Sequence, residues 1–193
     1  MKRRTFDGIV TLVGFGLGLF LIIAAGLLNW GYGFADKAVS SQLSSQEISL
    51  PSVTGNAKEE ASVTAFFKDN GDKPMTTGKQ AQMYADHYLG FHLSAMPTYA
   101  DATTASRSAA GALAASPDDP ALQAAAAKAN GVVDTVFKGT MLRGTLLTAY
   151  AFWELGQIAR ISAGVVLIAA LLLLLLSFAG WLHLRRTPEE ATI

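Results

Sequence analysis

Two long apolar stretches constrain this chain more than any other feature of its 193 residues. Residues 161–184 carry no formal charge and are followed by Arg185 and Arg186. At ~1.5 Å per residue, a helix of that length exceeds the ~30 Å hydrocarbon core of a bilayer. Residues 9–28 form a second uncharged run, in which Thr11 is the one polar side chain. We therefore predict a membrane-spanning helix in each stretch.

Each stretch has a competing interpretation. Residues 161–184 could form the buried core helix of a soluble protein, but Leu, Ile, Val and Phe each favour membrane insertion by ~0.3–0.6 kcal/mol. Residues 9–28 follow three basic residues and precede the small residues Gly33 and Ala35, as in a cleaved signal peptide. The apolar region of a signal peptide usually holds ~7–15 residues. The greater length of this run favours an uncleaved anchor.

Basic residues near the two stretches predict their orientation. Five basic residues lie at the ends of the stretches nearest the chain termini, at Lys2, Arg3, Arg4, Arg185 and Arg186. Lys37 and Arg160 lie at the ends nearest the central segment. The cytoplasmic side of a span carries the excess of Lys and Arg. We expect a multi-pass protein of the cell membrane with both termini in the cytoplasm.

The expected fold class is all-α, with two transmembrane helices forming a hairpin and a helical-bundle extracytoplasmic domain between them. The expected segments are a tail at 1–8, a span at 9–30, the extracytoplasmic domain at 31–160, a span at 161–184 and a tail at 185–193. Tails this short would leave no room for a signalling or enzymatic domain.

Apolar spacing, capping residues and Gly or Pro breaks predict the helices of the central segment. They are 36–46, 58–69, 78–96, 99–116, 120–130 and 132–160, and the first of them is expected to continue the helix of the first span. A strand at 62–67 is the alternative to the second helix. We expect Thr76 or Thr77 to cap the third helix, and Asp119 and Pro120 to begin the fifth. The sixth helix is expected to continue into the second span, and Gly139 and Gly144 are the positions at which it could break. The expected core consists of Phe66, Phe67, Tyr84, Tyr88, Leu89, Phe91, Leu113 and Leu122.

Small residues predict where the two spans meet. Gly14 and Gly18 form a small-x-x-x-small pair, and Ser177 and Gly180 lie at a similar depth on the returning span. Glycine spacing alone does not distinguish packing within the chain from association between chains. Lys37 and Glu154 lie at similar heights beyond the spans, which suggests an ion pair, with two independently solvated side chains as the alternative.

The residues offer little chemistry. His87, His92 and Asp86 form the one polar cluster suited to metal binding, but a separation of five residues turns the two imidazoles ~140° apart on an α-helix. There is no cysteine. We therefore predict no catalytic, cofactor-binding or metal-binding residues. Zero formal net charge argues against a nucleic-acid partner.

Two stretches, TTGKQAQMYADHYLGFHL (76–93) and TVFKGTMLRGTLLTAYAFWELGQIAR (135–160), resemble an uncharacterised family of actinobacterial two-pass membrane proteins. The resemblance implies the two-pass topology. Some family members carry the label aromatic ring-opening dioxygenase. That chemistry needs an iron held by histidines and a carboxylate, and this sequence offers no such set.

These features predict a non-enzymatic integral membrane protein, an accessory or scaffold subunit whose helical ectodomain contacts an envelope component or a larger membrane complex. Expected partners are the lipid bilayer and either a second copy or another membrane protein. The alternative is a homo-oligomeric two-pass pore, although neither span offers a polar stripe to line water. An ectodomain enzyme is the third reading.

Overall fold

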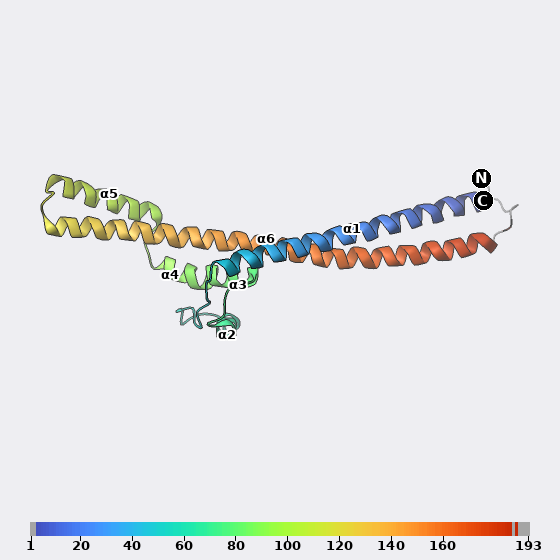
Figure 1. Ribbon diagram of the computed structural model, residues 1–193, viewed down its shortest axis with the longest axis horizontal. Helices are drawn as coiled ribbons and strands as arrows, with labels where there is room; N and C mark the ends of the chain where they lie inside the picture. The colour runs from blue at the N-terminus through green and yellow to red at the C-terminus, as the bar shows by residue number, and fades with distance from the viewer. Residues whose placement is uncertain (1–2, 187, 189–193) are drawn as a thin grey trace. The chain divides into compact units, whose positions relative to one another are not determined.

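The computed structural model describes residues 3–186 and Pro188, so residues 1–2, 187 and 189–193 of the predicted tails, Lys2 among them, lie outside the described part. Within that part every regular element is helical, which confirms the predicted all-α class (Figure 1). The elements are α1 (Arg3–Ser45), α2 (Ala61–Asn70), α3 (Gly78–Met83), the π-helix η1 (Tyr84–Leu89), α4 (Gly90–Ser94), α5 (Tyr99–Ala115) and α6 (Pro120–Arg186).

The chain forms two compact units. The terminal unit consists of Met1–Lys37 together with Glu154–Ile193, and the central unit consists of Ala38–Trp153. Residues distant in sequence thus make up the first unit, whereas the second is one continuous segment. The two units are described separately below.

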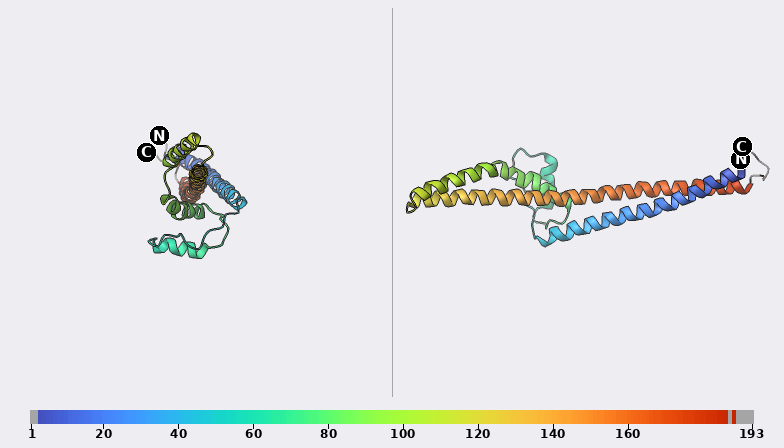
Figure 2. Two further views of the ribbon diagram at one scale, coloured as in Figure 1. Left: turned by 90° about the vertical axis from the view of Figure 1, so that its left-hand side faces the viewer. Right: turned by 90° about the horizontal axis from the view of Figure 1, so that it is seen from above.

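In the terminal unit, α1 and α6 pack side by side in antiparallel directions (Figure 2). Leu184 lies beside Gly8, whereas Gly156 lies beside Ala35 at the other end of the unit. Along the contact, residue numbers therefore increase on α1 as they decrease on α6, as in an antiparallel pair. Each of the two helices is long and apolar enough to cross a membrane.

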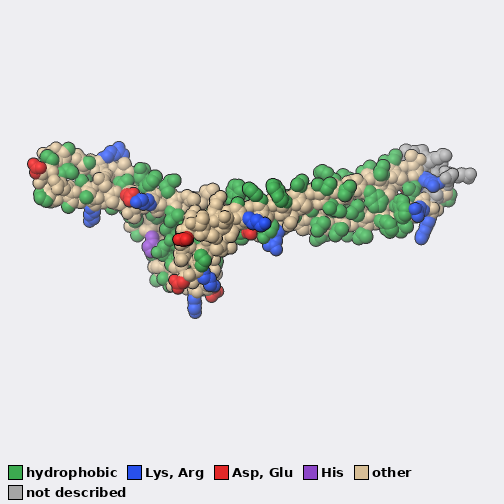
Figure 3. Space-filling model, in the orientation of Figure 1, with side chains coloured by type: hydrophobic (Ala, Val, Ile, Leu, Met, Phe, Trp, Pro, Cys, Tyr) green, Lys and Arg blue, Asp and Glu red, His purple; other side chains and the backbone are tan. Residues whose placement is uncertain are grey.

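The apolar side chains of the terminal unit are mostly not covered by protein. In the most apolar 18-residue window of each helix, 17% of the residues are buried. Figure 3 shows hydrophobic side chains over most of the visible face of these helices. A core helix of a soluble protein would instead be buried on most sides.

In the central unit, two clusters of buried side chains form the core. The larger consists of Val39, Leu43, Leu50, Met75, Ala81, Ala85 and Leu146, and the smaller of Val63, Phe67 and Met83. An isolated antiparallel bridge between Ser49 and Pro74 joins the two loops that flank α2. The bridge holds the chain so that Leu50 and Met75, from either side of α2, enter one cluster.

The predicted core is correct in part. Phe67 is fully buried, and Phe66, Tyr84, Tyr88 and Leu89 pack against the two clusters. Phe91 is 38% exposed, so its assignment to the core was wrong. Leu113 and Leu122 are half-buried and belong to neither cluster. They lie in the two-helix arm of α5 and the start of α6, which has no third layer to cover them (Figures 1 and 2).

Local capping signals are confirmed. The Thr77 hydroxyl accepts a hydrogen bond from the Gln80 N–H at 3.2 Å, and the Gln80 side chain accepts one from the Thr77 N–H at 3.0 Å. This reciprocal capping box starts α3. The Asp119 carboxylate accepts from the Ala121 N–H at 2.8 Å, at the start of α6. The segment predicted at 58–69 is the helix α2 rather than a strand.

Two helix predictions need correction. The helix expected at 78–96 ends at Ser94 and is interrupted by the π-helix η1, a wider turn in which the Ala85 carbonyl accepts from both the Gly90 N–H and Arg143. The helices expected at 120–130 and 132–160 are one helix, α6, which continues as predicted through the second apolar stretch. α6 continues through Gly139, where the missing side chain lets Leu93 approach the backbone: a Cβ on Gly139 would lie 2.8 Å from Leu93 Cδ2.

Gly78 allows the start of α3 to approach α6 within the central unit. A Cβ at this position would lie 2.6 Å from Trp153 Cγ. We expect Gly78→Ala to destabilise the protein by ~1–3 kcal/mol, since the atoms that it meets lie at the base of the Trp153 side chain and cannot swing away. Thermal unfolding of the full chain in mild detergent, followed by circular dichroism, measures the effect.

Gly111→Ala is the matched control, because a Cβ there has no neighbour within 4 Å. Alanine in the middle of α5 should stabilise the protein by ~0.5–1 kcal/mol through its higher helix propensity. Equal melting temperatures for the two variants would contradict the close packing of α3 on α6.

Candidate functional site

A seam of small residues joins α1 and α6 in the terminal unit. On α6, four buried small residues recur every seven positions, at Gly156, Ala163, Ala170 and Ser177. On α1, the buried residues Thr11, Gly18 and Ala25 have the same spacing, with the buried Gly14 between the first two. A seven-residue repeat keeps one face of a helix against its partner along their length.

The structure brings the predicted packing residues to this seam. A Cβ on Gly14 would collide with Ser177 Oγ, and a Cβ on Gly18 would lie 2.7 Å from Leu174 Cγ. A Cβ on Gly180 would lie 3.0 Å from Thr11 Oγ1. These contacts join two segments of one chain, which is one of the two alternatives that the glycine spacing left open.

Sequence reasoning found part of the seam. It selected Gly14, Gly18, Ser177 and Gly180 but did not single out Gly156 or Ala170, both of which are buried. The available signal was the seven-residue recurrence of small residues along the second apolar stretch. It is easily overlooked because other small residues, such as Ser162, Gly164 and Ala169, lie beside these positions in the sequence.

Lys37 and Glu154 form no ion pair in the described part of the chain. Their heights do match, because the neighbouring contact pairs Ala35 with Gly156. Each residue is two positions from that contact, however, and two residues turn a helix by ~200°. Both side chains therefore leave from the side of the helix that faces away from the seam.

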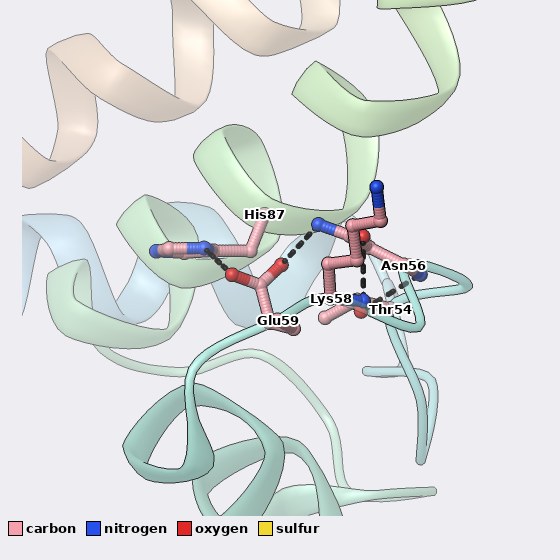
Figure 4. A network of polar contacts seen from close by, with 5 residues as sticks. All are labelled: Thr54, Asn56, Lys58, Glu59 and His87. Carbon is pink, nitrogen blue, oxygen red and sulfur yellow. Dashed lines mark hydrogen bonds and ion pairs between the residues drawn. The ribbon is translucent and has the colours of Figure 1, made fainter.

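A second polar arrangement surrounds the π-helix in the central unit. The Glu59 carboxylate lies 3.1 Å from Nδ1 of His87 and 3.4 Å from the Asn56 amide nitrogen (Figure 4). The loop before Glu59 is closed by its own polar contacts, since Asn56 Oδ1 accepts from the Lys58 N–H at 3.0 Å. The Glu59 side chain is 12% exposed. This contact fastens the loop that precedes α2 to the π-helix.

Arg143, on α6, holds the opposite side of the π-helix. Its Nη2 lies 2.8 Å from the Asp86 carboxylate, and its Nε donates to the Ala85 carbonyl at 3.0 Å. The Gly90 N–H donates to the same carbonyl, in the i to i+5 pattern of a π-helix. One carbonyl thus serves both the π turn and the bond to α6. π turns are frequent at functional sites.

His92 and His87 contact the same loop. The His92 ring packs 4.4 Å from the Tyr88 ring, and its Nδ1 lies 2.8 Å from the Tyr88 carbonyl oxygen. A Cβ on Gly55 would lie 3.4 Å from His92 Cε1, so the loop passes directly over this imidazole. Gly55 has a φ of +83°, which glycine adopts without strain. His87 contacts this loop farther along, at Glu59.

Two tyrosines complete the arrangement. The rings of Tyr84 and Tyr88 lie 5.0 Å apart. Burial first, and the charge of neighbouring Tyr88 second, raise the pKa of the Tyr84 hydroxyl above its usual value of 10.0. The Tyr84 hydroxyl is therefore neutral at physiological pH. Among the described residues, no group of three or more His, Cys, Asp or Glu side chains is placed to hold a metal ion.

No protein-family model matches the sequence, and no match was found among curated proteins or solved structures. The resemblance to the actinobacterial two-pass family therefore stays a prediction. The arrangements described above are the basis for assigning a function.

The contact between Glu59 and His87 gives a local prediction. Glu59→Gln removes the charge that faces the imidazole, so amide hydrogens in residues 53–60 should exchange several times faster as the loop opens more often. Hydrogen-exchange mass spectrometry on the full chain measures this rate. Glu60→Gln makes the same charge change at an exposed neighbour and should leave the rate unaltered. Similar exchange in both variants would contradict an anchoring role for Glu59.

The seam predicts a specific disulfide, which is readily tested because the chain contains no cysteine. Thr11→Cys with Gly180→Cys should form an intrachain disulfide on mild oxidation, because side chains at these positions face each other at bonding distance. Thr11→Cys with Ala179→Cys should react poorly, since residue 179 is exposed. Cleavage at a protease site inserted between α5 and α6, followed by non-reducing electrophoresis, detects the link.

A second pair of variants tests the contact between Gly14 and Ser177. Gly14→Leu should lower the disulfide yield by forcing α1 and α6 apart. Gly16→Leu places the same side chain where a Cβ has no neighbour within 4 Å, and the yield should not change. Disulfides between chains in place of the intrachain link would indicate that the glycines join separate molecules.

Proposed function

We propose that this chain is a non-enzymatic integral membrane protein with two transmembrane helices paired as a hairpin. In this proposal, the terminal unit lies in the cell membrane with both ends of the chain in the cytoplasm, and the central unit is an extracytoplasmic helical domain. The protein acts as an accessory or scaffold subunit, whose extracytoplasmic domain contacts an envelope component or a larger membrane complex.

The observation that carries the proposal is the exposure of large apolar side chains. Among the described residues 30 such side chains are exposed, and 24 of them lie in the terminal unit, twelve on each helix. In water, burial of apolar surface is worth ~25 cal/mol per Å², so leaving this many groups exposed is costly. In lipid, by contrast, small residues pack against the partner helix and leucines can face outward without this cost.

The charge distribution supports the orientation. Arg3, Arg185 and Arg186 lie near one end of the paired helices, and Lys37 and Arg160 lie near the other. With Lys2 and Arg4, the first group has the larger number of basic residues, which favours the cytoplasmic side. Arg185 also stacks on the Trp181 ring at 3.7 Å, an arrangement suited to the membrane interface.

The form of the central unit supports a role in partner contact. Its arm is two helices thick, and α5 has one buried residue, Ala102. The arm is held by few specific contacts, including the hydrogen bond from the Ser106 hydroxyl to Asn130 Oδ1 at 2.5 Å and the packing of Tyr99 on Phe137. Alanine-rich helices with so little mutual burial leave most of their surface for another molecule.

Cysteine labelling on intact cells tests the topology. Ser116→Cys, in the exposed turn between α5 and α6, should react with a membrane-impermeant maleimide added outside. Thr5→Cys and Pro188→Cys should react only after the membrane is opened, because both lie beyond the cytoplasmic ends of the spans. External labelling at residues 5 and 188, with protection at 116, would refute the orientation.

Native mass determination after mild-detergent extraction from the same cells tests the role. A stoichiometric complex with a different protein or envelope component is expected, and deletion of the arm (residues 99–130) should abolish it without removing the protein from the membrane. A closed ring of identical chains would instead favour the homo-oligomeric pore.

A further inference from the structure

A groove lies between α1 and α6 at the end of the terminal unit that carries Arg160. It has a volume of about 440 Å³, which is within the ~300–1,000 Å³ range of ligand sites. Its floor consists of the small residues Ala25, Gly26, Ala163 and Gly164. These four positions carry a methyl group or no side chain, so a hollow remains between the two helices.

Polar groups border one end of the groove. Arg160 and Asn29 line it there, whereas Ile22 and Leu167 line the other end. The Arg160 guanidinium lies 5.2 Å from the centre of the Tyr32 ring, and its Nη1 lies 3.5 Å from the Tyr32 hydroxyl oxygen. No ion pair with Arg160 occurs in the part of the chain that the structure describes. Its positive charge is thus held in place by an aromatic ring and left available to an anion.

We propose that this groove binds one anionic phospholipid of the outer leaflet, an inference that rests on the proposed membrane location. The Arg160 guanidinium donates hydrogen bonds to the phosphodiester, the Asn29 amide supplies a second polar contact, and one acyl chain lies over the glycines and alanines.

The dimensions of the groove fit this ligand. Arg160 directly precedes the second span, which is the level of the headgroups. From Arg160 to Leu167, and likewise from Asn29 to Ile22, the chain rises by ~10 Å at ~1.5 Å per residue. This length covers about two thirds of the hydrocarbon depth of one leaflet, ~15 Å. The charged end of the groove thus meets the headgroup, and the apolar end meets the upper part of the acyl chain.

The charge of the rim favours a lipid over a second copy of the chain. A protein helix placed in this hollow would bring apolar side chains against the guanidinium and leave its charge without a partner. A phosphodiester supplies the complementary charge, and arginine binds phosphate through two parallel hydrogen bonds. Basic pockets between transmembrane helices bind anionic headgroups on the same physical grounds.

Native mass spectrometry of the full chain in mild detergent tests the site, with phosphatidylglycerol and phosphatidylcholine as probes. One phosphatidylglycerol should bind in preference to phosphatidylcholine. Arg160→Gln should weaken phosphatidylglycerol binding about tenfold or more, as loss of one charge-assisted hydrogen bond does. Lys37→Gln removes the same charge from the same end of the unit, away from the seam, and should leave binding unaltered.

A second pair of variants fills the groove. A Cβ on Gly26 has no neighbour within 4 Å, so Gly26→Leu should occupy the acyl-chain position without disturbing the helices and should abolish binding of the lipid. Gly16→Leu, equally free of neighbours but outside the groove, should retain it. Equal binding in R160Q and K37Q, or in G26L and G16L, overturns the proposal. A dimer that forms without lipid and that dissociates in the G26L variant would also overturn the proposal.

Alkaline carbonate extraction of the cell membranes separates this result from the membrane assignment. Release of the chain into the soluble fraction would refute the proposed function itself. Retention in the membrane, together with equal lipid binding in all four variants, would refute the lipid site alone.

Discussion

Close approach of two helix backbones is the interaction on which the terminal unit depends. Gly14 lies so near Ser177 that no side chain fits between them, and small residues continue along α6 at every seventh position. In lipid, leucine gains nothing by turning from the bilayer to a neighbouring helix, so helix pairs rely on dispersion contacts between closely packed atoms. The large apolar side chains are consequently left on the outer surface, where they face the lipid in the proposed arrangement. Near Ala25 and Ala163 the same seam widens into the proposed lipid groove.

The central unit is held together differently, by a small aromatic core and a few polar contacts around an irregular helix. The π turn directs Asp86 toward Arg143 and His87 toward Glu59, so that one short helix is fastened on two sides. The partly exposed ion pair between Arg143 and Asp86 contributes ~0–1 kcal/mol. The main effect of the two contacts is therefore to fix the positions of the loop and of α6. Phe67, Met75 and Leu146 are fully buried, and burial of each such side chain is worth about 1.5–3 kcal/mol, more than the ion pair.

These two modes of packing suit the two environments that we propose. Exposed leucines and a groove with one arginine fit lipid, while the thin, alanine-rich arm of the central unit fits a protein or envelope partner. Such an arm gains little from its own folding, because alanine buries little surface, and is therefore well suited to be completed by another molecule. The proposed subunit would contact the bilayer through one unit and its partner through the other.

The sequence by itself determined the features that depend on neighbouring residues. The all-helical class, the two apolar helices, the capping box at Thr77 and the start of α6 after Asp119 are all encoded within a few positions of where they occur.

The tertiary structure decided the rest. At the π turn, Ala85 accepts a hydrogen bond from Arg143, 58 residues away in sequence, and Leu93 packs on Gly139 within the uninterrupted helix α6. Lys37 and Glu154 face away from the seam because of the register of α1 against α6, and no local sequence pattern specifies that register. Register and irregular turns are set by contacts between distant segments, and those contacts exist only once the chain has folded.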